Sequence, residues 1–304
     1  MMKALLQTAL LLGLLSLVRC FPLEDVDDSD SDSSEQGVVA TGVLNNCTCG
    51  WANKEDQRIV GGEATKENEY PMMAGFVLLE RDMIVCGGTI ITQRHIITAG
   101  HCTDVYYPTD YGIYVGHHNY EQAKAKGRVK LLEPQEFFVH DNYDGFTLKY
   151  DIAVVLMKDP IMFNNNVGPA CLPKQRIPLE GERLKVLGWG LTKYKGKTSD
   201  VLLKVNLDVQ QFETCKDHNQ YLELDDRHQI CTFRKNKDSC SGDSGGPLLW
   251  LDPDTNRYTL VAATSYGLNC AKYPAVSSDV YYFLPWIQSI ISKSDPNQRT
   301  CAKM

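Results

Sequence analysis

Beyond Arg58, short apolar runs alternate with polar segments that carry turn residues. Clear examples of the runs are residues 75–79, 113–115, 151–156 and 184–187. The segments between them carry Gly, Pro, Asn or Asp. Many short strands separated by turn signals are typical of a β sandwich or barrel, so we expect an all-β domain.

One segment near the C-terminus follows a different period. Its apolar residues recur at steps of three and four: Val280, Phe283, Leu284, Ile287, Ile290 and Ile291. That spacing places them along one face of a helix. We therefore expect a C-terminal amphipathic α-helix.

The first 20 residues have the pattern of a secretory signal. Lys3 supplies a positive charge, residues 4–18 are apolar, and cleavage is expected after Cys20. The run is short for a membrane anchor and is followed by acidic residues. We expect residues 1–20 to be removed and the protein to be secreted.

An acidic segment follows the signal. Residues 24–35 read EDVDDSDSDSSE, which offers too little apolar area to offset the entropy of ordering the chain. We expect residues 21–58 to form an acidic, disordered propeptide. Asn46, Cys47 and Thr48 make a glycosylation sequon whose occupancy the sequence leaves open.

Eleven cysteines occur in the chain, and an even number remains once Cys20 is removed. In an exported protein this indicates a disulfide framework. The sequence lacks the paired CxxC motifs of a zinc site, and Cys47 and Cys49 are too close together to begin one. We expect no metal and no other cofactor.

The most informative stretch is GDSGGP at residues 242–247. A serine hydroxyl is a poor nucleophile unless a base takes its proton. The glycines beside Ser244 would let backbone N–H groups face a developing oxyanion without a Cβ in the way. Taken alone, the stretch is also consistent with a glycine-rich turn.

Two further fragments favour a catalytic serine. His101 stands beside a cysteine in TAGHC, and Asp151 opens the apolar run DIAVVL. A carboxylate in such a run would be costly to bury unless it served a partner. In the order His, Asp, Ser, the three fragments closely resemble those of the chymotrypsin/trypsin family, and the resemblance covers residues 59 to about 292.

This resemblance implies two six-stranded antiparallel Greek-key barrels with the active site in the crevice between them. It also implies that family's catalytic triad of serine, histidine and aspartate. Ser244 would be the nucleophile, His101 the general base and then acid, and Asp151 the residue that orients the imidazole. The N–H groups of Gly242 and Ser244 would form the oxyanion hole. Because the whole triad is kept, a catalytically silent homologue is disfavoured.

The sequence QRIVGG at residues 57–62 resembles the activation junction of the same family. Cleavage after Arg58 would free the α-amine of Ile59, and an ammonium needs a counter-charge when it is buried. By resemblance that counter-charge is Asp243. We expect a zymogen with a protease domain at residues 59–292 and a tail at 293–304; whether it activates itself stays open.

Asp238 stands where trypsin-like members carry the acid of the S1 pocket, and Ser239, Ser265 and Gly267 are implied to line that pocket. A buried carboxylate there pairs with a substrate Lys or Arg and rejects apolar side chains. Ala275 departs from the family, which generally has Gly there, and its methyl narrows the slot. We expect cleavage after Arg or Lys, with slower turnover or an altered Arg-to-Lys ratio.

The resemblance also implies a set of disulfides. The pairs are Cys86–Cys102, Cys215–Cys231, Cys240–Cys270 and Cys49–Cys171. The last would keep the cut propeptide attached. Cys47 and Cys301 remain, for a bond with each other or with a second molecule.

Several expectations concern binding partners. Residues 117–127 align with a loop that binds calcium in some relatives, but of its acids mainly Glu121 remains, so we expect no calcium. A net charge of −7 argues against nucleic acid. The short cysteine-bearing propeptide is similar to that of arthropod venom or haemolymph proteases. We expect a monomer that meets protein or peptide substrates, an activating protease and protein inhibitors, and no membrane.

Overall fold

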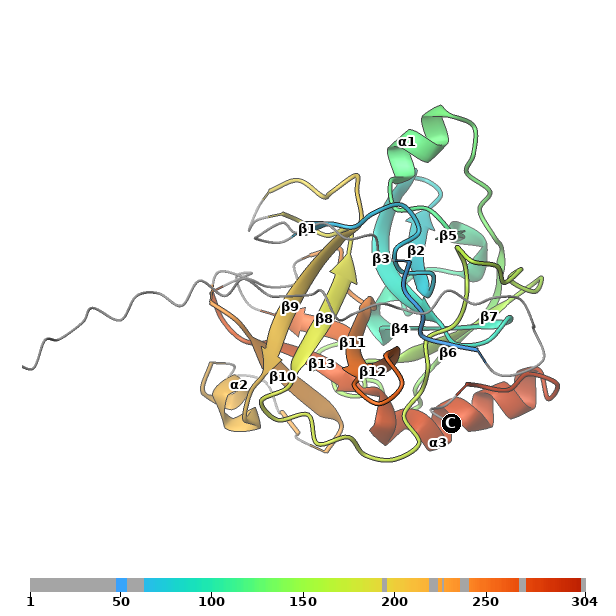
Figure 1. Ribbon diagram of the computed structural model, residues 1–304. Coiled ribbons are helices and arrows are strands. Elements are labelled where there is room, and N and C mark those ends of the chain that lie inside the picture. The colour runs from blue at the N-terminus through green and yellow to red at the C-terminus, as the bar shows by residue number, and fades with distance from the viewer. Residues whose placement is uncertain are drawn as a thin grey trace, which may run out of the picture. The chain divides into compact units, whose positions relative to one another are not determined.

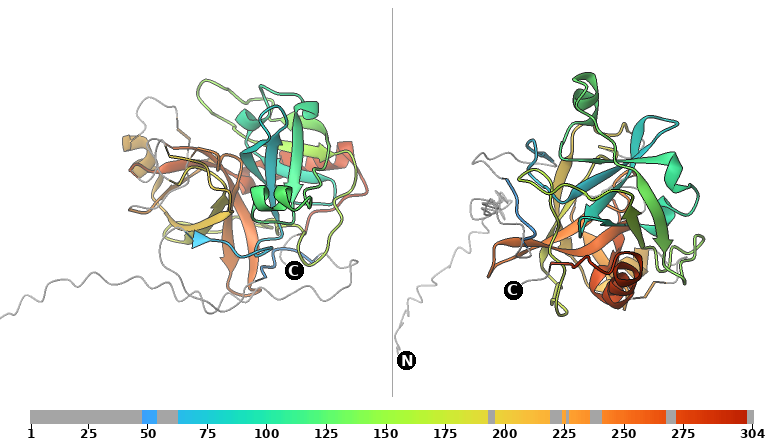
Figure 2. Two further views of the ribbon diagram at one scale, coloured as in Figure 1. Left: turned by 90° about the horizontal axis from the view of Figure 1, so that it is seen from above. Right: turned by 90° about the vertical axis from the view of Figure 1, so that its right-hand side faces the viewer.

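The computed structural model describes residues 48–53, 63–192, 196–218, 224–225, 227–235, 241–267 and 272–301. All of them fall in one unit, Asp32–Met304. Two antiparallel sheets lie side by side in this unit (Figures 1 and 2).

The first sheet has six strands in the order β5-β2-β3-β4-β7-β6. These strands are β2 (Met73–Leu78), β3 (Met83–Ile90), β4 (His95–Thr98), β5 (Tyr111–Val115), β6 (Pro134–Val139) and β7 (Ala153–Met157). An isolated bridge between Ile113 and Leu132 brings the chain just before β6 back to β5. The sheet therefore curls into an incompletely closed barrel.

The second sheet closes into a ring, because β8 pairs with both β11 and β9. Its strands are β8 (Arg183–Gly188), β9 (Leu203–Val209), β10 (Gln229–Phe233), β11 (Pro247–Asp252), β12 (Arg257–Gly267) and β13 (Ala275–Asp279). The short strand β1 (Glu63–Ala64) adds to β9 as a seventh member outside the ring. The expected pair of six-stranded antiparallel barrels is confirmed, with β1 as an unforeseen addition.

The helices of the described residues are short, except for the last one. They are η2 (Gly100–Cys102) and η3 (Pro108–Asp110), both 3-10 turns, and α1 (Tyr120–Ala125), α2 (Phe212–His218) and α3 (Val280–Ser294). None of these helices has the length and apolar character needed to cross a membrane.

The helix α3 confirms the prediction from apolar spacing. Its buried residues are Val280, Phe283, Ile287 and Ile291. The Asp279 carboxylate accepts hydrogen bonds from the N–H groups of Tyr281 and Tyr282, which caps the helix. The helix packs against β7 of the first barrel and β12 of the second (Figure 1), so it joins the two.

Both faces of several strands are buried, which explains why their apolar runs are nearly continuous. In β7, Val155 packs inside the first barrel, whereas Val154 joins the cluster shared with α3. In β8, Val186 and Leu187 divide in the same way between the second barrel and that shared cluster. One apolar run thus supplies both a barrel interior and an interface, because side chains alternate along a strand.

Candidate active site

Strands β4 and β7 bring His101 and Asp151 together. They pair with Thr98 opposite Ala153, so the turn η2 that follows β4 lies beside the residues that precede β7. The Nδ1 atom of His101 lies 2.8 Å from Oδ2 of Asp151, and the main-chain N–H of His101 donates to Oδ1 at 2.9 Å. One carboxylate therefore holds both the ring and the backbone of His101.

The Asp151 side chain is buried, which would penalise an unpaired carboxylate. Hydroxyl groups of the second barrel bond both this carboxylate and the main chain of the same residue. Ser265 of β12 donates to Oδ2 of Asp151, and Ser278 of β13 donates to its main-chain oxygen at 2.6 Å. The sequence pattern assigns Ser265 only to the substrate pocket and misses Ser278. The one feature that could have indicated Ser278 is a small hydroxyl residue within a buried strand.

Opposed effects set the pKa of His101. Burial lowers the pKa, while the hydrogen bond and charge of Asp151 and the charge of Asp104 raise it. The net shift is upward from the ordinary value of 6.5. Asp104, which no motif indicates, is positioned by its N–H donating to the carbonyl oxygen of Gly100 at 3.1 Å. The surroundings therefore stabilise an imidazolium at this position.

Both barrels hold the loop that carries Ser244. The N–H of Gly87 in β3 donates to the carbonyl oxygen of Ser244 at 2.8 Å, and the N–H of Gly245 donates to that of Thr264 in β12 at 2.7 Å. The Sγ atom of Cys102 lies 3.6 Å from the same Ser244 oxygen. Because Cys102 directly follows His101, these contacts place the serine loop beside the histidine.

Glycine is required on both sides of this serine. Gly242 and Gly245 have φ values of +99° and +74°, a region that L side chains rarely adopt. A Cβ on Gly245 would lie 2.1 Å from Oγ1 of Thr98, and one on Gly242 would lie 2.9 Å from Cα of Gly190. The loop is therefore closely packed, and its backbone conformation disfavours any residue other than glycine at these two positions.

The Asp243 side chain lies against the end of β8 and the residues that follow it. Its Oδ1 atom accepts the N–H of Gly190 at 2.7 Å. A Cβ on Gly188 would lie 1.9 Å from the same oxygen, so this carboxylate occupies space that only glycine leaves open. Its expected partner Ile59 and the cleavage residue Arg58 lie outside the described residues.

Part of the expected substrate pocket is described. Gly267 in β12 pairs with Ala275 in β13, and the Ala275 methyl lies 3.4 Å from the position of a Cβ on Gly267. The methyl therefore packs against Gly267, which has no side chain of its own at this point. Asp238 and Ser239 lie outside the described residues.

Three of the implied disulfides are present. They are Cys49–Cys171, Cys86–Cys102 and Cys215–Cys231. Cys301 is also disulfide-bonded, and its Sγ lies 4.0 Å from the carbonyl oxygen of Thr48. Cys47, Cys240 and Cys270 lie outside the described residues.

One group of side chains has the spacing of metal ligands. The ligand atoms of Cys86, His101 and Cys102 lie within 4.8 Å of one another. The two sulfurs are joined in a disulfide, so neither can supply the thiolate that a metal binds. This group therefore does not fit a metal.

Comparison with known proteins agrees with this geometry. Residues 59–287 match the protein family described as Trypsin. A venom serine protease of Polistes dominula is 38% identical over 257 residues, which cover 83% of this chain and 91% of that protein. Trypsin-1 of Astacus astacus is 34% identical over 76% of this chain and 99% of its own length.

Venom serine protease 34 of Apis mellifera is 36% identical over 80% of this chain, but the match spans only 60% of that protein. The family match covers most of the chain, and it includes the buried aspartate, the histidine turn and the serine loop. The chain belongs to the trypsin family and is a trypsin-like serine endopeptidase.

Proposed function

We propose that the chain is secreted as an inactive precursor, is activated by cleavage after Arg58, and then cuts proteins after Arg or Lys. The observation that carries this proposal is the His101–Asp151 pair, held by the second barrel beside the Ser244 loop.

In the proposed mechanism, the Oγ atom of Ser244 attacks the substrate carbonyl carbon while Nε2 of His101 takes its proton. Asp151, bonded to Nδ1, stabilises the imidazolium that results. The N–H groups of Gly242 and Ser244 donate to the oxyanion. His101 then gives its proton to the leaving amine as the peptide bond breaks. In the second half of the reaction His101 takes a proton from water as the water attacks the acyl carbonyl carbon, and it returns that proton to Oγ of Ser244 as the ester bond breaks.

The proposed specificity rests on Asp238 and Ser239 at the base of S1. The described wall supports a slot of restricted width, since the Ala275 methyl faces Gly267. A basic side chain would reach the Asp238 carboxylate, whereas an apolar one would leave that charge unpaired. The methyl is expected to slow turnover and to change the preference between Arg and Lys.

The proposed activation uses the new α-amine of Ile59 as the partner of Asp243. Burial of both charges would be favourable only as a pair. Support comes from the position of Asp243, whose carboxylate accepts the N–H of Gly190 in the segment after β8. An ammonium there would order the adjoining oxyanion-hole loop.

The domain boundaries follow from this scheme. We propose a signal at residues 1–20, a propeptide at 21–58, the protease domain at 59–292 and a tail at 293–304. Cys47 is the proposed partner of Cys301, since the Cys301 sulfur lies near the carbonyl oxygen of Thr48. The Cys240–Cys270 bond completes the set.

The relatives suggest the setting. They include a proclotting enzyme and a clotting factor G beta subunit of Tachypleus tridentatus, which are 30% and 29% identical to this chain. We propose that this chain likewise performs limited proteolysis outside the cell as a monomer, with an activating protease and protein inhibitors as partners.

The test is to express the precursor, cut it at Arg58, and assay peptide substrates with Arg, Lys, Phe or Leu at P1. Cut wild type is expected to cleave the Arg and Lys substrates, and a cut Ser244→Ala variant is expected to be inactive. Equal inactivity of the two proteins would contradict catalysis. A preference for Phe or Leu would contradict the assigned S1 pocket alone.

A further inference from the structure

The residue before the proposed catalytic aspartate has an unusual backbone conformation. Tyr150 has φ +52°, and Leu148, two positions earlier, has φ +54°. In this region the Cβ atom lies too close to the following carbonyl oxygen, so residues other than glycine adopt it at an energetic cost. Tyrosine also lacks the short polar side chain with which Asn and Asp offset that cost by a local hydrogen bond. Contacts outside the local chain must therefore hold Tyr150 in this conformation.

Aromatic rings from three separate parts of the fold pack against the Tyr150 ring. The imidazole of His140, directly after β6, is parallel to it within 9°, and the ring centroids are 5.1 Å apart. The imidazole of His228, directly before β10, has its centroid 4.4 Å away at a tilt of 31°. Phe283 of α3 meets the ring edge-on at 6.1 Å. Rings attract one another at such distances, so these contacts hold the Tyr150 side chain in place.

The two histidines are themselves fixed by their main chains. The N–H of His140 donates to the carbonyl oxygen of Ile152 at 3.1 Å. The carbonyl oxygen of His228 accepts the N–H of Asp279 at 3.0 Å. Burial lowers the pKa of both imidazoles, so at neutral pH they pack as uncharged rings. The Tyr150 ring thus rests on a frame built from both barrels and α3.

The conformation of Tyr150 determines where the next residue lies. The carbonyl oxygen of Tyr150 accepts the N–H of Ile152 at 2.8 Å, so the chain turns tightly around Asp151. The Asp151 carboxylate lies 2.8 Å from Nδ1 of His101. If Tyr150 relaxed to a negative φ, the peptide group between Tyr150 and Asp151 would rotate, and the carboxylate would leave this position. The packed ring therefore has a direct route to the catalytic pair.

Filling space is the simpler role for this ring. In that role the effect of a substitution would follow the volume of the side chain, so Tyr150→Ala and Tyr150→Gly would be about equally harmful. A ring that holds a positive φ gives a different order. Glycine adopts this φ readily, whereas alanine keeps the strain and loses the contacts that oppose it. Tyr150→Gly should then retain more function than Tyr150→Ala, although its side chain is smaller.

We propose that Tyr150 is a positioning residue. Its ring, packed against His140 and His228, holds the positive φ of the backbone. That φ directs the Asp151 carboxylate to Nδ1 of His101. The proposal deepens the proposed function and rests on it, since Tyr150 acts on turnover only through the triad.

The kinetic test uses the chain cut after Arg58 and a small Arg substrate. Tyr150→Phe keeps the ring and is expected to retain kcat within about twofold. Tyr150→Ala should lower kcat about 30-fold and Tyr150→Gly only about fivefold, because a misplaced reacting group costs rate and Gly tolerates the φ. KM should change less than about threefold in each variant, since the loss is confined to the transition state. A kcat for Tyr150→Gly no higher than that for Tyr150→Ala would overturn the proposal.

A spectroscopic test reports on the catalytic pair without any turnover. In the uncut full chain, the proton between Nδ1 of His101 and the Asp151 carboxylate is expected to give a far-downfield ¹H NMR resonance, because it lies in a short charge-assisted hydrogen bond. Tyr150→Phe should keep this resonance, Tyr150→Ala should lose it or move it upfield, and Tyr150→Gly should restore it in part. An unchanged resonance in Tyr150→Ala would overturn the proposal. An inactive wild type that shows these shifts would instead refute the proposed function alone.

The matched control is Tyr120, a buried tyrosine of α1 whose ring packs edge-on against Tyr114 at 5.0 Å and whose hydroxyl donates to Asp82. Its backbone is helical, so alanine suits this position better than glycine. Tyr120→Ala and Tyr120→Gly should lower the melting temperature, with Gly the lower of the two, and keep kcat within about twofold of wild type. If Tyr120→Ala moved the His101 resonance as far as Tyr150→Ala does, general loosening of the barrel would explain both and the proposal would fail.

The packing against Tyr150 is tested separately at His140. His140→Ala removes one of the two imidazoles and should lower kcat about threefold, whereas His140→Phe restores a ring and should keep kcat within about twofold of wild type. In a Tyr150→Gly background His140→Ala should have no further effect, because no ring is left to hold. Equal losses of kcat in the two backgrounds would overturn the role of this contact.

Discussion

At the scale of single residues, the buried carboxylate of Asp151 is the centre of the site. His101 approaches it from the first barrel, while Ser265 and Ser278 approach it from the second. The hydroxyl of Ser265 bonds the carboxylate itself, whereas that of Ser278 bonds the main-chain oxygen. This difference separates a role in tuning His101 from a role in holding the chain.

Ser265→Ala is expected to lower kcat about tenfold with little change in KM, which corresponds to one hydrogen bond to a charged group. Without that donor, Asp151 has more negative charge to share with His101, so the pKa of His101 should rise further. The raised pKa of His101 is expected to place the acid limb of the kcat/KM profile above the ordinary value for histidine, and Ser265→Ala should move that limb to still higher pH. Ser278→Ala should leave the acid limb in place. If Ser265→Ala raised KM instead of lowering kcat, Ser265 would act in the substrate pocket.

Gly245 is the second residue whose surroundings make a sharp prediction. Its positive φ and its closeness to Thr98 mean that Gly245→Ala should displace the serine loop and lower kcat/KM at least 100-fold, as misplacement of a reacting group does. Gly181→Ala is the control, since Gly181 has φ +79° with nothing within 4 Å of its Cβ position. If both variants lost activity equally, backbone strain rather than crowding would be the cause.

At the scale of elements, His95 joins β4 to α3. Its ring nitrogens lie 2.8 Å from the hydroxyl of Thr92 and 2.9 Å from that of Ser294. Arg94 adds an ion pair to Asp295, just beyond the helix, at 3.6 Å. These contacts hold α3 against the first barrel by polar groups as well as by its buried face.

This link predicts a loss of stability in acid. Burial lowers the pKa of His95 to about 4, so between pH 6.5 and pH 4 the unfolded chain binds a proton at this position that the folded chain does not. Stability should therefore fall as the pH decreases through that window, by up to about 3 kcal/mol from this group. Urea unfolding at pH 7 and pH 4.5 measures it, and His95→Gln should reduce the difference. An equal pH dependence in the variant would refute the assignment.

At the scale of the whole molecule, a disulfide joins the chain segments on either side of the proposed cleavage site. Cys49 precedes Arg58 in the chain, and it is bonded to Cys171. Cys171 lies in the segment that connects β7 of the first barrel to β8 of the second. A cut at Arg58 would therefore leave two polypeptides joined by a covalent bond. The N-terminal piece stays with the enzyme.

Cleavage after Arg58 is accordingly expected to give one band on a non-reducing gel and two bands after reduction. Cys49→Ser should release the N-terminal piece even without a reductant, provided that Cys47 is replaced as well. Release of the piece from the unmutated protein would contradict the tether. Retention in the double variant would show that other contacts hold it.

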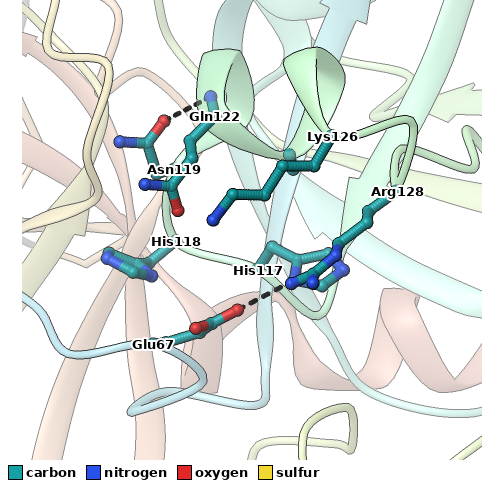
Figure 3. Close-up of a pocket in the computed structure, with 8 residues that line it drawn as sticks. Glu67, His117, His118, Asn119, Gln122, Lys126 and Arg128 are labelled. Atoms are coloured by element: carbon teal, nitrogen blue, oxygen red, sulfur yellow. Dashed lines mark hydrogen bonds and ion pairs between the residues drawn. The ribbon is translucent and has the colours of Figure 1, made fainter.

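Much of this architecture is predictable because its signals are local. The apolar period of α3, the strand-and-turn pattern and the motifs around His101, Asp151 and Ser244 each depend on a few adjacent residues. The added strand β1 is not predictable, since its two residues gain their structure only from Lys204 and Leu203 of β9. The surface pocket that Glu67, Lys126 and Arg128 line beside α1 (Figure 3) also lacks a signal, because Glu67 is distant in sequence from the other two residues.

The class of this protein follows from its sequence alone, because its reactive groups and the glycines beside them lie in short specific motifs. The three-dimensional fold alone shows which hydroxyls bond Asp151 and which backbone N–H the Asp243 carboxylate accepts. Those contacts depend on the register of strands far apart in the chain and on the packing of one barrel against the other. No short stretch of residues contains that information.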